Sequence, residues 1–389
     1  MLAKLRGDIL GMRQLNVPFA MPDGGKVLHI GLPKTGTTAL QTALHRSRPV
    51  LAEQGVFNAS PGRHPYPAAR FAAGNALPFR VEQAEEGWRR VARRFRESTA
   101  RATIFSSEAL FAANQERAQA IAEELGGAPY IVVTLRALAA QLRAQWQQSF
   151  VSNGHRTFDE WMTKRLNNQE RLNWIAPQRI LDAWGPVVGE DKIIFMIASP
   201  DRTAIFRRFE ALLGMTPESL EMPHLDNAAL SASGSEFLRQ INVIETAKRD
   251  DPNSVRAEVL RRGTWRIQHT PGVGREPVRV PRWAAARANE IAHEWMSQLE
   301  DSSAAVVGAI DDLVVDLDGL PEQVTTPTQI DVGDAARFAL AFCEAAVRYV
   351  EKPPGEAAVR AEDLPLRDLL AIVRARVARR LSGRRTTRD

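Results

Sequence analysis

The segment from Lys26 to Leu44, KVLHIGLPKTGTTALQTAL, constrains the fold more than any other part of this chain. It opens with a short apolar run of the kind found in buried parallel strands. The stretch that follows, Gly31-Leu-Pro-Lys-Thr-Gly36, interrupts that run with two glycines and a proline. From Thr37 onward, apolar residues recur at helical spacing. The sequence therefore predicts a strand, a tight loop and a helix that begins at the loop.

This arrangement predicts a binding site for an anion. Unpaired backbone N–H groups and the positive end of the helix dipole point into such a loop. Lys34 adds a full positive charge, and three threonines add hydroxyl donors: Thr35, Thr37 and Thr38. The alternative is a glycine-containing turn with an exposed lysine. Because strand, loop, lysine, threonines and helix all agree, we expect the loop to bind a phosphate group.

The position of the lysine separates this loop from that of the nucleoside triphosphatases. Their pattern, G-x-x-x-x-G-K-[ST], has the lysine directly after the second glycine. Here Thr37 occupies that place and the lysine is inside the loop, as Lys34. The pattern P-K-T-G-T-T resembles the 5'-phosphosulfate loop of sulfotransferases that use 3'-phosphoadenosine-5'-phosphosulfate (PAPS). The resemblance implies that Lys34 contacts the bridging oxygen and the sulfuryl group. It also implies a cofactor site made of Pro33, Lys34, Thr35, Gly36, Thr37 and Thr38.

The same resemblance implies the fold. The chain resembles bacterial sulfotransferases that contain the motifs H-I-G-x-x-K-T-G-T-T and S-S-E. This resemblance extends loosely over residues 26–245. Members have an α/β, P-loop-like three-layer fold, with a central parallel sheet of four or five strands and helices on both faces. We expect a lead-in at 1–25, a PAPS-binding core at 26–245, a mostly helical extension at 246–363, and a basic helix and tail at 364–389. Strands are predicted at 27–30, 102–105, 130–135 and 192–197, a long loop at 56–80, and helices at 37–51, 81–100, 137–151, 204–213, 284–300 and 334–350.

Glu108 is the candidate general base. It follows the predicted strand 102–105 within Ser106-Ser107-Glu108, and the carboxyl ends of parallel strands line the ligand crevice. A carboxylate there can take the proton of an attacking hydroxyl or amine. It can equally stabilise the first turn of the next helix. The resemblance favours the role of general base for Glu108, since the family's base is taken to be the glutamate of S-S-E. His64, in the loop 56–80, is the second catalytic candidate, although loop histidines are usually only solvated.

Arg136 is the candidate for binding the 3'-phosphate that distinguishes PAPS from ATP. In the resembling family an arginine at a strand end and a serine eight residues later share this task. Arg136 ends the clearest predicted strand, where an arginine suits anion recognition. Ala144 stands in place of the serine. Arg143, Gln141 or Gln148 could supply the missing donor from nearby helical turns.

Composition bounds the remaining possibilities. The chain has 389 residues, 44% hydrophobic and 25% charged, which is ordinary for a soluble globular protein. A net charge of +5 suits an anionic ligand but is too small to indicate nucleic-acid binding. The single cysteine, Cys343, excludes a disulfide framework and a four-cysteine zinc site, and its Ala/Phe-rich surroundings predict a buried thiol.

Without an apolar run of membrane-spanning length or a cleavable leader, the sequence predicts a cytoplasmic protein. The basic 364–389 tail could touch an anionic surface.

The resemblance implies a PAPS-dependent sulfotransferase that acts on a hydroxyl or amine of a carbohydrate, lipid or small metabolite and needs no metal. One alternative is a P-loop kinase or nucleotidase that uses Mg-ATP. The other is a non-catalytic nucleotide-binding scaffold. Arg261 and Arg262 precede a basic Gly/Pro loop and are further candidates for nucleotide contact. The sequence indicates neither the acceptor nor the oligomeric state.

Overall fold

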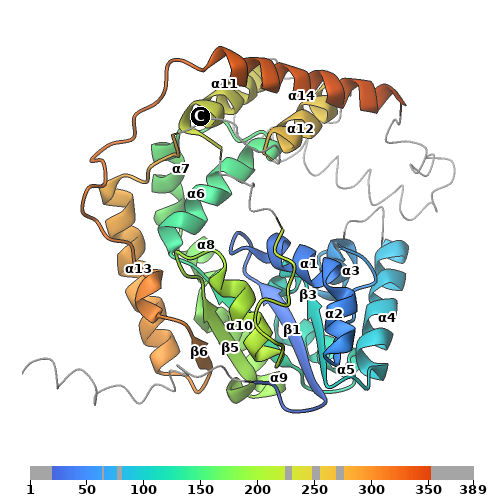
Figure 1. The fold of residues 1–389 in the computed structure, drawn as a ribbon. Coiled ribbons are helices and arrows are strands. Elements are labelled where there is room, and N and C mark those ends of the chain that lie inside the picture. Colours follow the sequence, from blue (N-terminus) through green and yellow to red (C-terminus); the bar gives the residue numbers. More distant parts are fainter. Residues whose placement is uncertain are drawn as a thin grey trace, which may run out of the picture.

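The computed structural model describes residues 20–63, 65–76, 81–223, 230–247, 255–268 and 276–351. In this part of the chain a six-stranded sheet lies between two layers of helices, and a further group of helices lies beyond its carboxyl edge (Figure 1). The predicted α/β class, with helices on both faces and a mostly helical C-terminal region, is confirmed.

The strands follow the order β2-β3-β1-β4-β5-β6, and every neighbouring pair is parallel. Their bounds are β1 Gly25–Gly31, β2 Val56–Asn58, β3 Ala102–Ser106, β4 Tyr130–Leu135, β5 Ile193–Ile197 and β6 Ala305–Val307. The four longer strands are apolar and almost wholly buried, because helices cover both of their faces. β1 lies between β3 and β4, and such a reversal of strand order is where ligands bind in open α/β sheets.

Both edge strands were missed by the sequence analysis. β2 and β6 have three residues each, too few to show a periodic pattern. β2 and helix α3 Tyr66–Ala72 occupy the segment 56–80, so the prediction of one long loop there was wrong. β6 comes from the predicted C-terminal extension and pairs with β5. The division of the chain at residue 245 stays a prediction.

Each face of the sheet has its own helical layer. One face packs against α1 Thr37–Arg46, α2 Arg48–Glu53 and α10 Ala204–Leu212. The opposite face packs against α4 Val81–Glu97, α5 Gln115–Glu124 and α9 Pro177–Val188, and α13 Arg282–Glu300 packs against α9. The helix predicted at 37–51 is two helices, which meet at Ser47. The large buried side chains of the second layer include Trp88, Phe95, Trp184 and Trp295.

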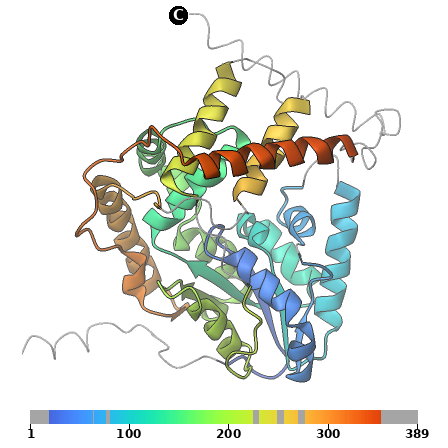
Figure 2. The same cartoon turned by 45° about the horizontal axis from the view of Figure 1, so that its top comes forward.

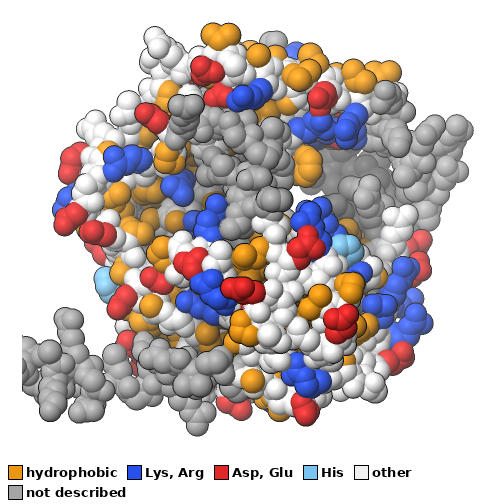
Figure 3. Space-filling model, viewed as in Figure 1, with side chains coloured by type: hydrophobic (Ala, Val, Ile, Leu, Met, Phe, Trp, Pro, Cys, Tyr) orange, Lys and Arg blue, Asp and Glu red, His pale blue; other side chains and the backbone are white. Residues whose placement is uncertain are grey.

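The remaining helices form the group beyond the carboxyl edge. They are α6 Leu138–Ser149, α7 Phe158–Leu166, α8 Gln169–Asn173, α11 Ala232–Ala247, α12 Val255–Gln268 and α14 Val332–Glu351. α14 packs against α12 and crosses the front of this group in Figure 2. The rings of Phe338 on α14 and Phe237 on α11 have centroids 5.1 Å apart. In the described part of the chain, no helix is both long and apolar enough to cross a bilayer. Basic and acidic side chains are both spread over the face shown in Figure 3.

Cys343 on α14 is exposed, so the prediction of a buried thiol was wrong. The Ala- and Phe-rich sequence around it reflects the inner face of the helix, where Phe338 and Ala345 are buried. Cys343 lies on the other face. Composition alone did not distinguish the two faces.

Candidate functional site

A cavity of about 1060 Å³ opens at the carboxyl edge of the sheet. Its walls come from the loop between β1 and α1, from α6, and from the segments that follow β3, β5 and β6. It brings together Pro33, Lys34, Thr35, Gly36, Thr37, Thr38, Glu108, Arg136 and Arg143, all singled out from the sequence. His64 lies outside the described residues.

The loop from Gly31 to Gly36 makes a tight turn directly before helix α1. Lys34 and Gly36 have φ angles of 70° and 98°, both in the left-handed region. At Gly36 this conformation has little steric cost, because glycine has no Cβ atom. The Thr35 hydroxyl donates to the Leu32 carbonyl at 2.6 Å and fixes the turn. Helix α1 begins directly after it, with no side-chain cap and no acidic residue in its first turn. Its first N–H groups are therefore available to a bound anion.

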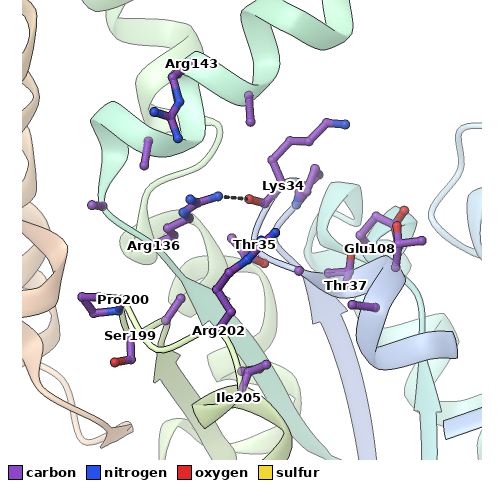
Figure 4. A pocket seen from close by; sticks show the side chains of 18 of the residues that line it. Lys34, Thr35, Thr37, Glu108, Arg136, Arg143, Ser199, Pro200, Arg202 and Ile205 are labelled. Atoms are coloured by element: carbon purple, nitrogen blue, oxygen red, sulfur yellow. Dashed lines mark hydrogen bonds between the residues drawn. The ribbon is translucent and has the colours of Figure 1, made fainter. Parts of the chain in front are cut away.

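Lys34 lines the cavity between Arg136 and Glu108 (Figure 4). Its ammonium group donates to Oε1 of Gln148 on α6, which ties the loop to that helix. Burial lowers the pKa of Lys34, and the charge of Glu108 opposes this shift. An anion bound beside this partly desolvated ammonium group, whose hydrogen-bond partner is a neutral amide, would stabilise its positive charge strongly.

Arg136, Arg143 and Arg202 form what we call the arginine group. Arg136 follows β4, Arg143 is on α6 and Arg202 follows β5, and all three point into the cavity on one side of Lys34 (Figure 4). The pKa of Arg136 is lowered first by burial and then by the charges of Arg143 and Arg202. Among the described residues, no carboxylate is paired with any of them. Such a cluster of like charges favours a multiply charged anion.

The hydrogen bonds of the arginine group go to backbone carbonyls. Arg136 donates to the carbonyl of Lys34 at 3.4 Å, and Arg143 donates to that of Val278 at 3.2 Å. One carboxylate that lines the same cavity, that of Asp201, engages other groups. Asp201 accepts hydrogen bonds from Thr203 and Arg207, which lower its pKa to about 2.

The structure narrows the choice of a substitute for the serine missing at position 144. Gln141 donates to the carbonyl of Pro33 at 3.0 Å, and Gln148 accepts from Lys34. Arg143 keeps donors toward the cavity, as does Arg202, which the sequence analysis missed. The signal that could have found Arg202 is its position just after a buried strand. Arg261 and Arg262 donate hydrogen bonds to Glu258 on α12 and do not line the cavity.

Glu108 lies on the other side of Lys34 from the arginine group (Figure 4). It begins a 3₁₀ helix, Glu108–Ala112, and its Oε2 accepts a hydrogen bond from the buried amide of Gln41 at 2.7 Å. A Cβ atom at Gly31 would come within 3.2 Å of Cβ of Glu108, so the loop and this residue are in close contact. The carboxylate thus has a fixed position beside the loop. Gln41 is a second residue that sequence reasoning missed.

A buried polar group lies within the sheet, near its carboxyl edge. His29 on β1 is 2.8 Å from the hydroxyl of Ser106 on β3 and 3.3 Å from that of Thr134 on β4. Burial lowers the pKa of His29 to about 3, so its ring is neutral near pH 7. It links three strands and carries no charge toward the cavity.

No group of three or more His, Cys, Asp or Glu side chains is placed to hold a metal ion within the described residues.

No family model matches this chain, and no curated protein is similar to it in sequence. Among solved structures, a sulfotransferase from Alicyclobacillus acidocaldarius matches with a TM-score of 0.34 and 15% sequence identity, over 60% of this chain and 97% of that one. A likeness this weak does not identify an activity. The functional proposal therefore rests on the cavity itself.

Proposed function

We propose that this protein transfers a sulfuryl group from PAPS to a hydroxyl or amine of an acceptor. The observation that carries the proposal is that two groups of residues with anion-binding chemistry line one cavity. One is the loop with Lys34, and the other is the arginine group, which has no described counter-ion. PAPS carries a 5'-phosphosulfate and a 3'-phosphate on opposite sides of its ribose. ATP concentrates its charge in one chain and gives the second group nothing to bind.

The residues present fit this donor. The first N–H groups of α1 and the nearby threonines would hold the 5'-phosphate, and the arginine group would hold the 3'-phosphate. When bound, PAPS supplies a sulfuryl group attached to phosphate through a weak sulfur–oxygen bond. Lys34 would stabilise the negative charge that builds on the bridging oxygen as this bond breaks.

Glu108 would complete the reaction from the other side of Lys34. Its carboxylate would take the proton of the acceptor as the acceptor's oxygen or nitrogen forms a bond to sulfur. Gln41 would hold the carboxylate in position through its 2.7 Å hydrogen bond. Adenosine 3',5'-bisphosphate leaves with the bridging oxygen. By analogy with phosphoryl transfer, positioning and charge stabilisation provide most of the catalysis.

Calorimetric titration tests this proposal directly. Adenosine 3',5'-bisphosphate and ATP are titrated into the protein, each with and without Mg²⁺. Tight binding of the bisphosphate that does not depend on metal, with weak binding of ATP, supports the sulfotransferase. A preference for Mg-ATP refutes it and favours a kinase or nucleotidase. Donor binding without transfer to any acceptor would favour a non-catalytic scaffold.

A further inference from the structure

A third basic region lines the same cavity. Arg46 at the end of α1 and Arg63 in the segment after β2 both contribute to its wall. In the sheet order, the segments after β2 and β3 lie on one side of the loop that follows β1, and those after β4 and β5 lie on the other. Arg63 therefore shares its side with Glu108, opposite the arginine group.

Arg63 is held beside α1, the helix that carries Gln41, the hydrogen-bond partner of the candidate base. Its Nε donates to the hydroxyl of Thr42 on α1 at 3.2 Å. Arg63 and Gln41 also line a small cavity of about 10 Å³, and Gln41 is the residue that holds Glu108. Arg63 and Glu108 both line the larger cavity, so a ligand bound there has both side chains around it.

The segment that carries Arg63 is itself fixed by arginines. Arg48 donates to the carbonyl of Ser60, and Arg94 donates to that of Ala59 at 3.1 Å. These bonds hold the backbone from which Arg63 projects. They also add positive charge near it, because both guanidinium groups remain ionised.

The positive charge of this region is only weakly neutralised. Arg46 pairs with Glu221 at 3.3 Å, but both side chains are well exposed, and such pairs contribute little. Among the described residues, no carboxylate is paired with Arg48 or Arg63. The pKa of His45 is lowered by burial and then by the charges of Arg48 and Arg63, which is consistent with a local positive potential.

We infer that the acceptor carries an anionic group, a carboxylate or a phosphate or sulfate ester, which Arg63 binds. This inference rests on the proposed function, since Glu108 and Lys34 define the acceptor side of the cavity. The donor's two anionic groups are already matched by the loop and by the arginine group. The third basic region is therefore left for the second substrate.

In the reaction, the acceptor's nucleophilic oxygen or nitrogen forms a bond to sulfur and gives its proton to Glu108. The bond from sulfur to the bridging oxygen breaks, and adenosine 3',5'-bisphosphate leaves with the electron pair. The acceptor's anionic group stays on Arg63 and takes no part in the transfer. Arg63 is accordingly a specificity residue for the acceptor.

The test uses the full chain saturated with adenosine 3',5'-bisphosphate. Inorganic phosphate, glucose 6-phosphate and glucose are then titrated into this complex by calorimetry. We expect the two anionic probes to bind at least about tenfold more tightly than glucose, as for a charge-assisted contact. Arg63→Gln should abolish this difference, and Arg63→Lys should keep part of it.

Arg90→Gln is the matched control. Arg90 is exposed on α4 and paired with Glu86, so this variant loses one positive charge without removing the hydrogen bond of Arg63 to Thr42. It should bind the probes like the unaltered protein. Similar or undetectable binding of all three probes overturns the inference, and so do equal losses in Arg63→Gln and Arg90→Gln. Failure of the bisphosphate to bind in the first step refutes the proposed function instead, before any probe is added.

Discussion

Replacing Arg136 with glutamine should separate nucleotide recognition from folding stability. The variant removes one guanidinium of the arginine group and leaves a polar side chain. If this guanidinium binds the 3'-phosphate, the lost charge-assisted hydrogen bonds amount to about 1.5–3 kcal/mol. Binding of adenosine 3',5'-bisphosphate should then weaken by roughly 10-fold to 150-fold. Adenosine 5'-phosphosulfate lacks the 3'-phosphate, so its affinity should hardly change.

The same substitution should not destabilise the ligand-free protein. The hydrogen bond of Arg136 to the Lys34 carbonyl is long, 3.4 Å, and its charge is repelled by Arg143 and Arg202. Glutamine removes that repulsion. We therefore expect an unchanged or slightly higher melting temperature, whereas loss of a structural side chain would lower it.

Calorimetry with both nucleotides and thermal unfolding without ligand measure the two effects. Arg90→Gln again provides the control for loss of charge, since Arg90 is exposed on α4. Equal weakening of both nucleotides would refute the assignment of Arg136 to the 3'-phosphate. A lower melting temperature with no change in nucleotide selectivity would show a structural role instead.

Three further predictions concern single residues. Lys34→Ala should lower the transfer rate far more than the affinity for adenosine 3',5'-bisphosphate, as single-turnover kinetics and calorimetry would show, and equal losses would contradict a transition-state role. Glu108→Gln should leave donor binding intact and slow transfer by roughly 10²–10⁴-fold, while undiminished transfer would move the base elsewhere, with His64 next. His29 has a folded-state pKa of about 3 against 6.5 in the unfolded chain, so stability should fall as the pH drops below 6.5, by about 2 kcal/mol at pH 5. Urea unfolding should show this slope in the unaltered protein and lose it in His29→Gln, and a slope common to both would exclude His29 as its source.

Those parts of the fold that bury a continuous apolar run could be predicted from the sequence. β1, β3, β4 and β5 lie within about two residues of their predicted bounds, because parallel strands covered on both faces need apolar side chains at nearly every position. β2 and β6 could not be predicted, since a three-residue strand is defined by its neighbour in the sheet. Helix α3 was missed because the glycines, prolines and asparagines around it are typical of loops.

The candidate site, like the fold, could be predicted only where its residues adjoin a predicted strand. Lys34, Glu108 and Arg136 were recognisable because each lies at the carboxyl end of a predicted strand, and these ends share one edge of a parallel sheet. Arg202 also follows a predicted strand, 192–197, but lies some residues beyond its end and was missed. Gln41 is on helix α1, and its contact with Glu108 depends on the order of the strands in the sheet. Interactions between distant segments require the strand order first.

The last strand of the sheet has a consequence for how the site assembles. Ile194 on β5 pairs with Ala305 on β6, 111 residues later, and the segment after β6 adds Asp312, Val315 and Asp316 to the cavity wall. Pairing of such distant segments closes a long loop and is slow compared with local contacts. During synthesis, the loop and its neighbouring strands leave the ribosome well before β6 exists. We therefore expect a nascent chain to form the loop between β1 and α1 early and to complete the wall of the cavity among its last folding steps.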